Sequence, residues 1–122
     1  MTFELSQRFY FEAAHTLRRQ IDAEGSLRIH GHTYHAEITI AGTPDPASGM
    51  MMDLAFLRQE IEKVREQLDH RFLDEVPGIG PATLENLCLF LHKQLKDTLP
   101  NIARVTVERP ASGDRCCLKL ID

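Results

Sequence analysis

Hydrophobic and polar residues alternate from residue 2 to residue 15, and this period of two predicts a β-strand. The hydrophobic positions of this strand share one parity: Phe3, Leu5, Phe9 and Phe11. His15 has the same parity, so an unbroken strand directs its imidazole toward the buried face. The polar residues 17–29 then predict a loop of moderate length.

A second strand is predicted from about residue 30 to residue 41. Its hydrophobic side carries Tyr34, Ile38 and Ile40 together with His30 and His32. The Pro- and Gly-containing residues 43–49 predict the turn that ends this strand.

Hydrophobic residues then recur at spacings of three and four, which predicts two amphipathic helices. The first carries Leu54, Leu57, Ile61, Val64 and Leu68 and is capped by Asp53. The second, from about residue 83 to residue 99, carries Leu84, Leu87, Cys88, Leu91 and Leu95. An irregular link over residues 69–82 joins them, and Pro100 ends the second helix.

Two more strands are predicted over residues 102–109 and 115–121, joined by a turn around residues 111–114. The order is strand, strand, helix, helix, strand, strand, which predicts an α+β domain with a four-stranded antiparallel sheet. Because such a sheet has open edges, we expect the chain to form a homo-oligomer.

The length of 122 residues suits a single domain spanning residues 1–122. Hydrophobic residues make up 43% and charged residues 26%, which is ordinary for a globular protein and excludes a disordered chain. No hydrophobic run approaches the ~18 residues of a membrane-spanning helix, so no membrane association is expected. The first residues do not resemble a secretory signal, which predicts a cytoplasmic protein.

The formal net charge is −4 and the basic residues are scattered along the chain. This argues against nucleic acid as a partner, because phosphate binding needs clustered Lys and Arg. The three cysteines, Cys88, Cys116 and Cys117, are expected to be free thiols.

Three histidines are candidate metal ligands. His30 and His32 are two residues apart, which on a strand places both imidazoles on one face. His15 supplies a third ligand if the two first strands pair as neighbours. Three histidines without a fourth protein ligand are typical of a catalytic zinc, whose open position binds water or substrate. Taken alone, however, such a His pair more often consists of solvated or core histidines.

Two further pairs are candidates for chemistry. Asp69 and His70 follow the first helix, and an Asp bonded to a His makes a proton shuttle near neutral pH. The alternative is a histidine that stabilises the helix C-terminus. Thr83 and Glu85 begin the second helix, where they either contact a substrate or cap the helix and complement its dipole.

Glu108 lies on the third long strand, with the parity of Arg104 and Thr106 and opposite Val105 and Val107. One interpretation is an exposed acid at a strand end. The other is a carboxylate that accepts two hydrogen bonds from the edge of an amino-pyrimidine ring.

Together these motifs resemble the 6-pyruvoyltetrahydropterin synthase / 6-carboxytetrahydropterin synthase family. The segments that carry the resemblance are 11–15, 30–34, 49–50 with Asp53, 68–70, Thr83 with 85–86, and 107–108. They occur in the family's order and cover nearly the whole chain. The resemblance implies the tunnelling fold (T-fold), in which two helices cover one face of the sheet and the subunits join their sheets into a barrel, usually in a hexamer built as a dimer of trimers.

The resemblance also implies the roles of these residues. Zinc on the three histidines would hold the side chain of 7,8-dihydroneopterin triphosphate. Glu108 would anchor the pterin ring with help from Thr83 and Glu85, and Asp69 with His70 would relay protons. Bacterial members of this length most often resemble the queuosine-pathway enzyme, a carbon–carbon lyase that yields 6-carboxy-5,6,7,8-tetrahydropterin, acetaldehyde and triphosphate.

The chain departs from the family pattern just before His30, where the family usually carries a proton-transferring cysteine. Ser26 occupies this position, and a hydroxyl ionises far less readily than a thiol with a pKa near ~8.5. Glu24 lies two residues upstream, and family members that use a glutamate instead favour cleavage of the dihydroneopterin side chain. Three alternatives follow: the carboxytetrahydropterin synthase, a related enzyme that forms 6-pyruvoyltetrahydropterin or cleaves the side chain, and a zinc- and pterin-binding protein without turnover.

Overall fold

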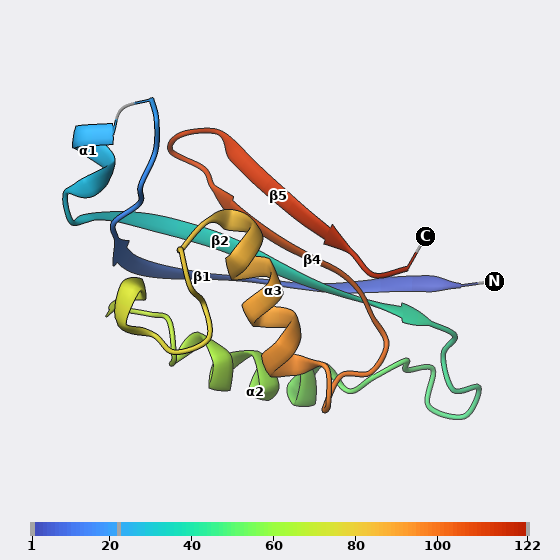
Figure 1. Cartoon of the computed structure of the whole chain (residues 1–122). Coiled ribbons are helices and arrows are strands. Elements are labelled where there is room, and N and C mark those ends of the chain that lie inside the picture. The colour runs from blue at the N-terminus through green and yellow to red at the C-terminus, as the bar shows by residue number, and fades with distance from the viewer. Residues whose placement is uncertain (1, 22, 122) are drawn as a thin grey trace.

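The computed structural model describes residues 2–21 and 23–121. Its elements in chain order are β1 (Phe3–His15), α1 (Ala23–Leu27), β2 (His30–Gly42), α2 (Leu54–Arg65), β3 (Arg71–Phe72), the 3-10 turn η1 (Leu73–Glu75), α3 (Leu84–Leu95), β4 (Ile102–Arg109) and β5 (Asp114–Lys119). Both long helices, α2 and α3, lie on the same side of the sheet (Figure 1). The predicted α+β architecture is therefore confirmed.

The sheet has the strand order β3-β1-β2-β4-β5. The four long strands are antiparallel to their neighbours, as the alternation predicts. The two-residue β3 is an addition that lies parallel to the end of β1. A strand of this length contains no complete alternation, so the pattern could not reveal it within the predicted link over residues 69–82.

The hydrophobic core lies between one face of the sheet and the two long helices. The sheet contributes Phe11, Tyr34, Ile38, Ile40, Val105 and Val107. The helices contribute Leu57, Ile61, Val64, Leu87, Leu91 and Leu95. Each buried hydrophobic side chain of this size stabilises the fold by roughly 1.5–3 kcal/mol. Because successive residues of a strand point to opposite faces, this face is set by residue parity.

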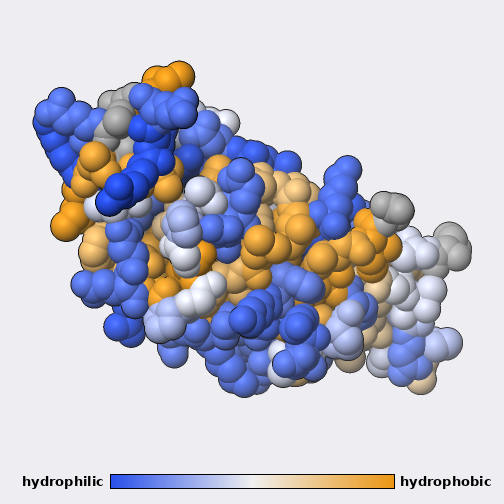
Figure 2. Space-filling model, in the orientation of Figure 1, coloured by the Kyte–Doolittle hydropathy of each residue, from blue (hydrophilic) through white to orange (hydrophobic). Residues whose placement is uncertain are grey.

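Both long helices begin at the predicted caps. The Asp53 carboxylate accepts a hydrogen bond from the backbone N–H of Ala55 over 2.8 Å, and the Thr83 hydroxyl accepts one from Asn86 over 3.1 Å. Both helices end earlier than the hydrophobic pattern predicts. The last hydrophobic residues of the two patterns, Leu68 and Leu99, are buried but lie in the turns that follow the helices. Hydrophilic side chains cover the lower edge of the molecule, where α2 lies, and hydrophobic ones reach the surface across the middle of this face (Figure 2).

The prediction of an uninterrupted loop over residues 17–29 is wrong, because α1 occupies five of these residues. A helix this short carries no hydrophobic periodicity, and Gly25 within it disfavours helix on propensity alone. Figure 1 shows α1 at the end of the sheet where β1 ends and β2 begins. None of the described helices is long and hydrophobic enough to cross a membrane.

Candidate active site

The structure brings the three candidate metal ligands together at one end of the sheet. His15 and His30 face each other in the register of β1 and β2, and His32 lies opposite Ala13. One ring nitrogen from each of the three histidines lies within 4.8 Å of the other two. All three residues share the parity of the buried residues on their strands, so their imidazoles gather on the helix-covered face.

Backbone carbonyl groups orient two of these rings. Nδ1 of His15 donates to the carbonyl oxygen of Ala82 over 3.1 Å, and Nδ1 of His30 donates to that of Arg28 over 2.7 Å. A carbonyl oxygen only accepts, so each Nδ1 carries the proton and each Nε2 keeps a lone pair. Carbonyl groups that fix the tautomer in this way are the usual outer partners of metal-bound histidines.

Burial and mutual repulsion keep two of the rings neutral. Burial, followed by the charges of His15 and Arg109, lowers the pKa of His32 to about 4. Burial and the neighbouring His30 also lower the pKa of His15, although the hydrogen bond to Ala82 raises it. Neutral imidazoles are the form that binds metal ions.

These nitrogens fit a tetrahedral metal ion. Nε2 of His15 and Nε2 of His32 lie 3.1 Å apart. Two ligand nitrogens at about 2.0–2.1 Å from a tetrahedral ion lie about 3.3 Å apart, so only a small movement separates this arrangement from a bound one. The described residues place no further His, Cys, Asp or Glu in this group, which leaves an open position for water or a ligand.

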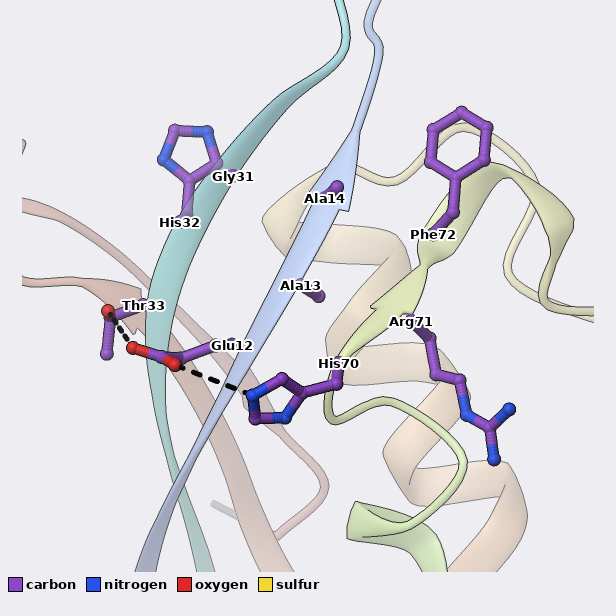
Figure 3. A pocket seen from close by; sticks show the side chains of 9 residues that line it. All are labelled: Glu12, Ala13, Ala14, Gly31, His32, Thr33, His70, Arg71 and Phe72. Atoms are coloured by element: carbon purple, nitrogen blue, oxygen red, sulfur yellow. Dashed lines mark hydrogen bonds and ion pairs between the residues drawn. The ribbon is translucent and has the colours of Figure 1, made fainter.

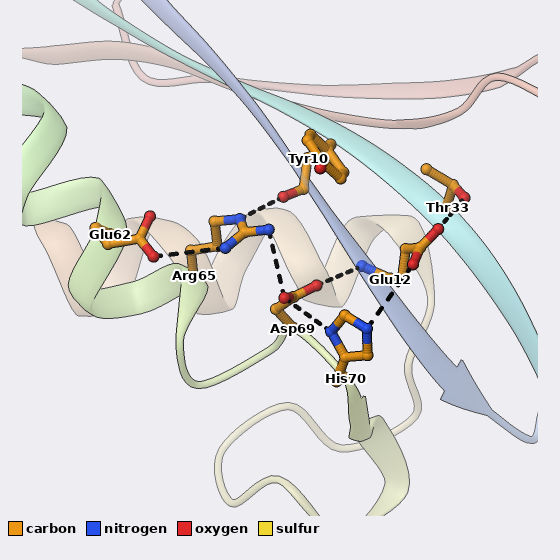
Figure 4. Close-up of polar contacts among 7 residues, drawn as sticks. All are labelled: Tyr10, Glu12, Thr33, Glu62, Arg65, Asp69 and His70. Atoms are coloured by element: carbon orange, nitrogen blue, oxygen red, sulfur yellow. Dashed lines mark hydrogen bonds and ion pairs between the residues drawn. The ribbon is translucent and has the colours of Figure 1, made fainter.

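Asp69 and His70 form a hydrogen-bonded pair directly after α2 (Figure 4). Nδ1 of His70 donates to the Asp69 carboxylate over 2.9 Å, and the other oxygen of that carboxylate accepts the backbone N–H of Glu12 over 2.9 Å. The Glu12 N–H bond is the main reason that the pKa of Asp69 is lowered, with smaller effects of His70 and Arg65 in the same direction. Asp69 is therefore ionised and holds His70 with Nε2 directed outward.

A pocket of about 570 Å³ is shared by His70 of this pair and His32, one of the three candidate metal ligands. Glu12 also lines it, and the Glu12 carboxylate lies between Thr33 and His70 (Figure 3). The Glu12 carboxylate accepts a hydrogen bond from the Thr33 hydroxyl over 3.2 Å, and its other oxygen lies 4.0 Å from Nε2 of His70. Sequence reasoning did not assign Glu12 a role, although its polar parity on β1 placed it on the face opposite the core.

The structure does not bring Glu108 to the histidines within the chain. Glu108 lies opposite His35 on β2 and Arg115 on β5, and with them it lines a small hollow on the face away from the helices. The reason is parity, since Val105 and Val107 point into the core and Glu108 therefore points away from it.

Arg109, the residue after Glu108, lies beside the histidines. It shares the parity of Val107 and lines a pocket of about 270 Å³ together with all three histidines. Its guanidinium lies 3.2 Å from the carboxylate of Asp114. The signal that would have found Arg109 was present in the sequence, because its parity on β4 is that of the buried residues.

Thr83 and Glu85 line a neighbouring pocket of about 670 Å³, which Arg109 also lines. The Thr83 side chain caps α3, as one of the two interpretations requires, and it borders this pocket at the same time. The Glu24 carboxylate lies 3.1 Å from Arg28 and is exposed. The side chain of Ser26 lies outside the described part of the structure.

The family model described as 6-pyruvoyl tetrahydropterin synthase matches residues 4–117. The human 6-pyruvoyl tetrahydrobiopterin synthase is 33% identical over 80% of this chain and 77% of its own. A dihydroneopterin monophosphate aldolase of Pyrococcus furiosus is 29% identical over 82% of this chain and 81% of its own. The solved structure of Caenorhabditis elegans 6-pyruvoyl tetrahydropterin synthase superposes with a TM-score of 0.84 at 29% identity, covering 98% of this chain and 96% of that one.

Proposed function

We propose, on the premise that the chain belongs to the 6-pyruvoyl tetrahydropterin synthase family, that it is a zinc-dependent lyase acting on the side chain of a dihydropterin. The observation that carries this proposal is that His32, one of three clustered imidazoles, and His70 of the hydrogen-bonded Asp69–His70 pair border one pocket. A metal site beside a positioned acid–base pair suits a reaction that removes protons next to a polarised oxygen.

Each residue of the pair has a distinct part in this reaction. His15, His30 and His32 would hold the zinc ion, which would act as a Lewis acid toward an oxygen of the substrate side chain. His70 accepts a proton at Nε2, because its Nδ1 already donates to Asp69. Asp69 is a positioning residue that stabilises the imidazolium formed. The Glu12 carboxylate, 4.0 Å from His70, adds a second negative charge beside that imidazolium.

The specific reaction that we propose converts 7,8-dihydroneopterin triphosphate and one water to 6-carboxy-5,6,7,8-tetrahydropterin, acetaldehyde and triphosphate, as in queuosine biosynthesis. The support for it is the family resemblance of the motifs. A second candidate is formation of 6-pyruvoyltetrahydropterin or cleavage of the side chain, which the names of the human and Pyrococcus relatives favour. A third is zinc and pterin binding without turnover.

Product analysis separates these candidates. The zinc-loaded protein is incubated with 7,8-dihydroneopterin triphosphate, and the products are identified by liquid chromatography and mass spectrometry. Acetaldehyde with the carboxypterin supports the first reaction, whereas pyruvoylpterin or hydroxymethylpterin supports the second. No product despite tight pterin binding contradicts the assignment as an enzyme. The His32→Ala variant is the control for activity that does not depend on the metal site.

We further propose that Ser26 and Glu24 take over part of the usual cysteine's proton transfer. The support is the position of α1, since Gly25 between these residues lines the histidine pocket. A Ser26→Cys variant is then expected to turn over faster and Glu24→Gln more slowly. An unchanged rate in Ser26→Cys contradicts the role of Ser26, and an unchanged rate in Glu24→Gln contradicts that of Glu24.

We also propose a homo-oligomer, a hexamer built as a dimer of trimers. β5 is an edge strand, and β1 is paired on its outer side only at Ala13 and Ala14 among the described residues. Open edges of this length are usually closed by pairing with another chain. Light scattering after size-exclusion chromatography measures the mass, and a monomer at micromolar concentration contradicts the proposal.

A further inference from the structure

We propose that Arg109 binds an anionic group of the substrate, a carboxylate or a phosphate, directly beside the metal site. This inference deepens the proposed function, on which it rests for the identity of the substrate's ring. The anionic group of the ligand would then bind next to the three-histidine site. The position of Arg109 on its strand is the first observation that supports it.

Arg109 is the last residue of β4, on the helix-covered face of the sheet. It borders the pocket that contains His15, His30 and His32, and also the pocket that contains Thr83. A ligand extending from the helix α3 end toward the histidines therefore passes this guanidinium. Among the residues that the structure describes, Arg19 and Arg109 are the two arginines that border both pockets.

The guanidinium of Arg109 is held in place but is only partly satisfied. The Asp114 carboxylate lies 3.2 Å from one terminal nitrogen and also accepts a hydrogen bond from the Ser112 hydroxyl over 3.0 Å. The inner nitrogen, Nε, is buried and has no hydrogen-bond partner among the described residues. A buried charged donor without an acceptor is unfavourable, so the pocket is arranged for an acceptor that arrives with a ligand.

The charges around Arg109 favour an anion. Arg19 borders both pockets and Arg115 borders the larger one, whereas the acids there are Asp114, which already accepts two contacts, and Glu85. The planar guanidinium matches carboxylate and phosphate oxygens, which accept two of its N–H groups at once. A neutral ligand would accept a weaker hydrogen bond from Nε of Arg109 than an anionic ligand does.

A binding experiment with matched pterins tests this inference. Neopterin has a neutral side chain, neopterin triphosphate adds phosphates, and pterin-6-carboxylate adds a carboxylate. The affinity of each is measured by calorimetry for the zinc-loaded wild type, for Arg109→Gln and for Arg58→Gln. Arg58 is a suitable control because it lies on α2, donates a hydrogen bond to Gln7 on β1 and does not line either pocket. Inorganic phosphate with the metal-free proteins adds a probe that needs neither pterin nor metal.

We expect Arg109→Gln to bind inorganic phosphate and at least one anionic pterin about tenfold more weakly, with neopterin and the zinc content unchanged. The anionic pterin that is affected identifies the group as carboxylate or phosphate, and Arg58→Gln behaves as the wild type. Wild-type affinity of Arg109→Gln for all anionic probes overturns the inference, as does an equal loss of neopterin. If no pterin binds the wild type, the proposed function fails, and the phosphate result still decides the role of Arg109.

Discussion

His70 donates a hydrogen bond from Nδ1 to the carboxylate of Asp69 over 2.9 Å while its own backbone adopts a φ of +58°. This left-handed conformation is uncommon for a residue other than glycine. Two hydrogen bonds to Glu12 on β1 hold the pair there, one from the N–H of His70 and one to Asp69. The sheet thus maintains a strained residue whose imidazole is exposed to the pocket, an arrangement typical of functional sites.

Replacing Asp69 by Asn is expected to slow turnover by about a hundredfold. The amide carries no negative charge to stabilise the imidazolium formed when His70 accepts a proton. Steady-state kinetics with the zinc-loaded proteins measure the effect. Asp53→Asn is the matched control, since Asn caps α2 about as well as Asp and lies away from the site. Wild-type turnover in Asp69→Asn contradicts the proton relay.

Removal of one imidazole is expected to abolish stoichiometric metal binding. His32→Ala leaves two ligands. The affinity for zinc is expected to fall by more than about tenfold, because loss of a residue that only hydrogen-bonds to a metal ligand already has an effect of that size. Competition with a chelating dye and elemental analysis measure it. His35→Ala is the control, because His35 lies on the same strand but on the opposite face. Equal zinc affinity in both variants would show that the histidines are not ligands.

Acid is expected to destabilise the metal-free protein through His32. In the folded protein the pKa of His32 is lowered from 6.5 to about 4, mainly by burial and then by His15 and Arg109. Between these values the unfolded chain binds more protons than the folded one, so the free energy of unfolding decreases as the pH falls through this window. Urea unfolding at pH 7.5 and 4.5 in the presence of a chelator measures the decrease.

The His32→Asn variant is expected to show a smaller decrease over the same pH window than the wild type. His35→Asn, on the opposite face of β2, serves as its control and is expected to keep the wild-type decrease. An identical pH dependence in all three proteins contradicts the assignment of this effect to His32.

Glu108→Gln is expected to leave pterin affinity within about twofold of the wild type, because Glu108 lies on the face of the sheet away from the histidine pocket. Glu85→Gln, which changes a residue of the pocket that Thr83 and Arg109 also line, is expected to weaken binding. Calorimetry with neopterin compares the two variants. A tenfold loss in Glu108→Gln would instead place its carboxylate in a site that two subunits build together.

Local patterns along the chain determined most of the fold. The period of two placed the histidines on the hydrophobic side of the first two strands, and the structure has them on the buried face. The caps Asp53 and Thr83 marked both helix starts. These features are readable because strand parity and helix capping depend on residues within a few positions of each other.

The tertiary structure alone decided how distant segments meet. It set the register that joins His15 to His30, the carbonyl of Ala82 that orients His15 from 67 residues away, and the bond between Glu12 and Asp69 across 57 residues. It also put Arg109 in the pocket, although its parity could have been read from the sequence. Contacts of this kind arise from packing of the whole chain. Residue spacing therefore predicts the metal site, but only the tertiary structure shows which side chains surround it.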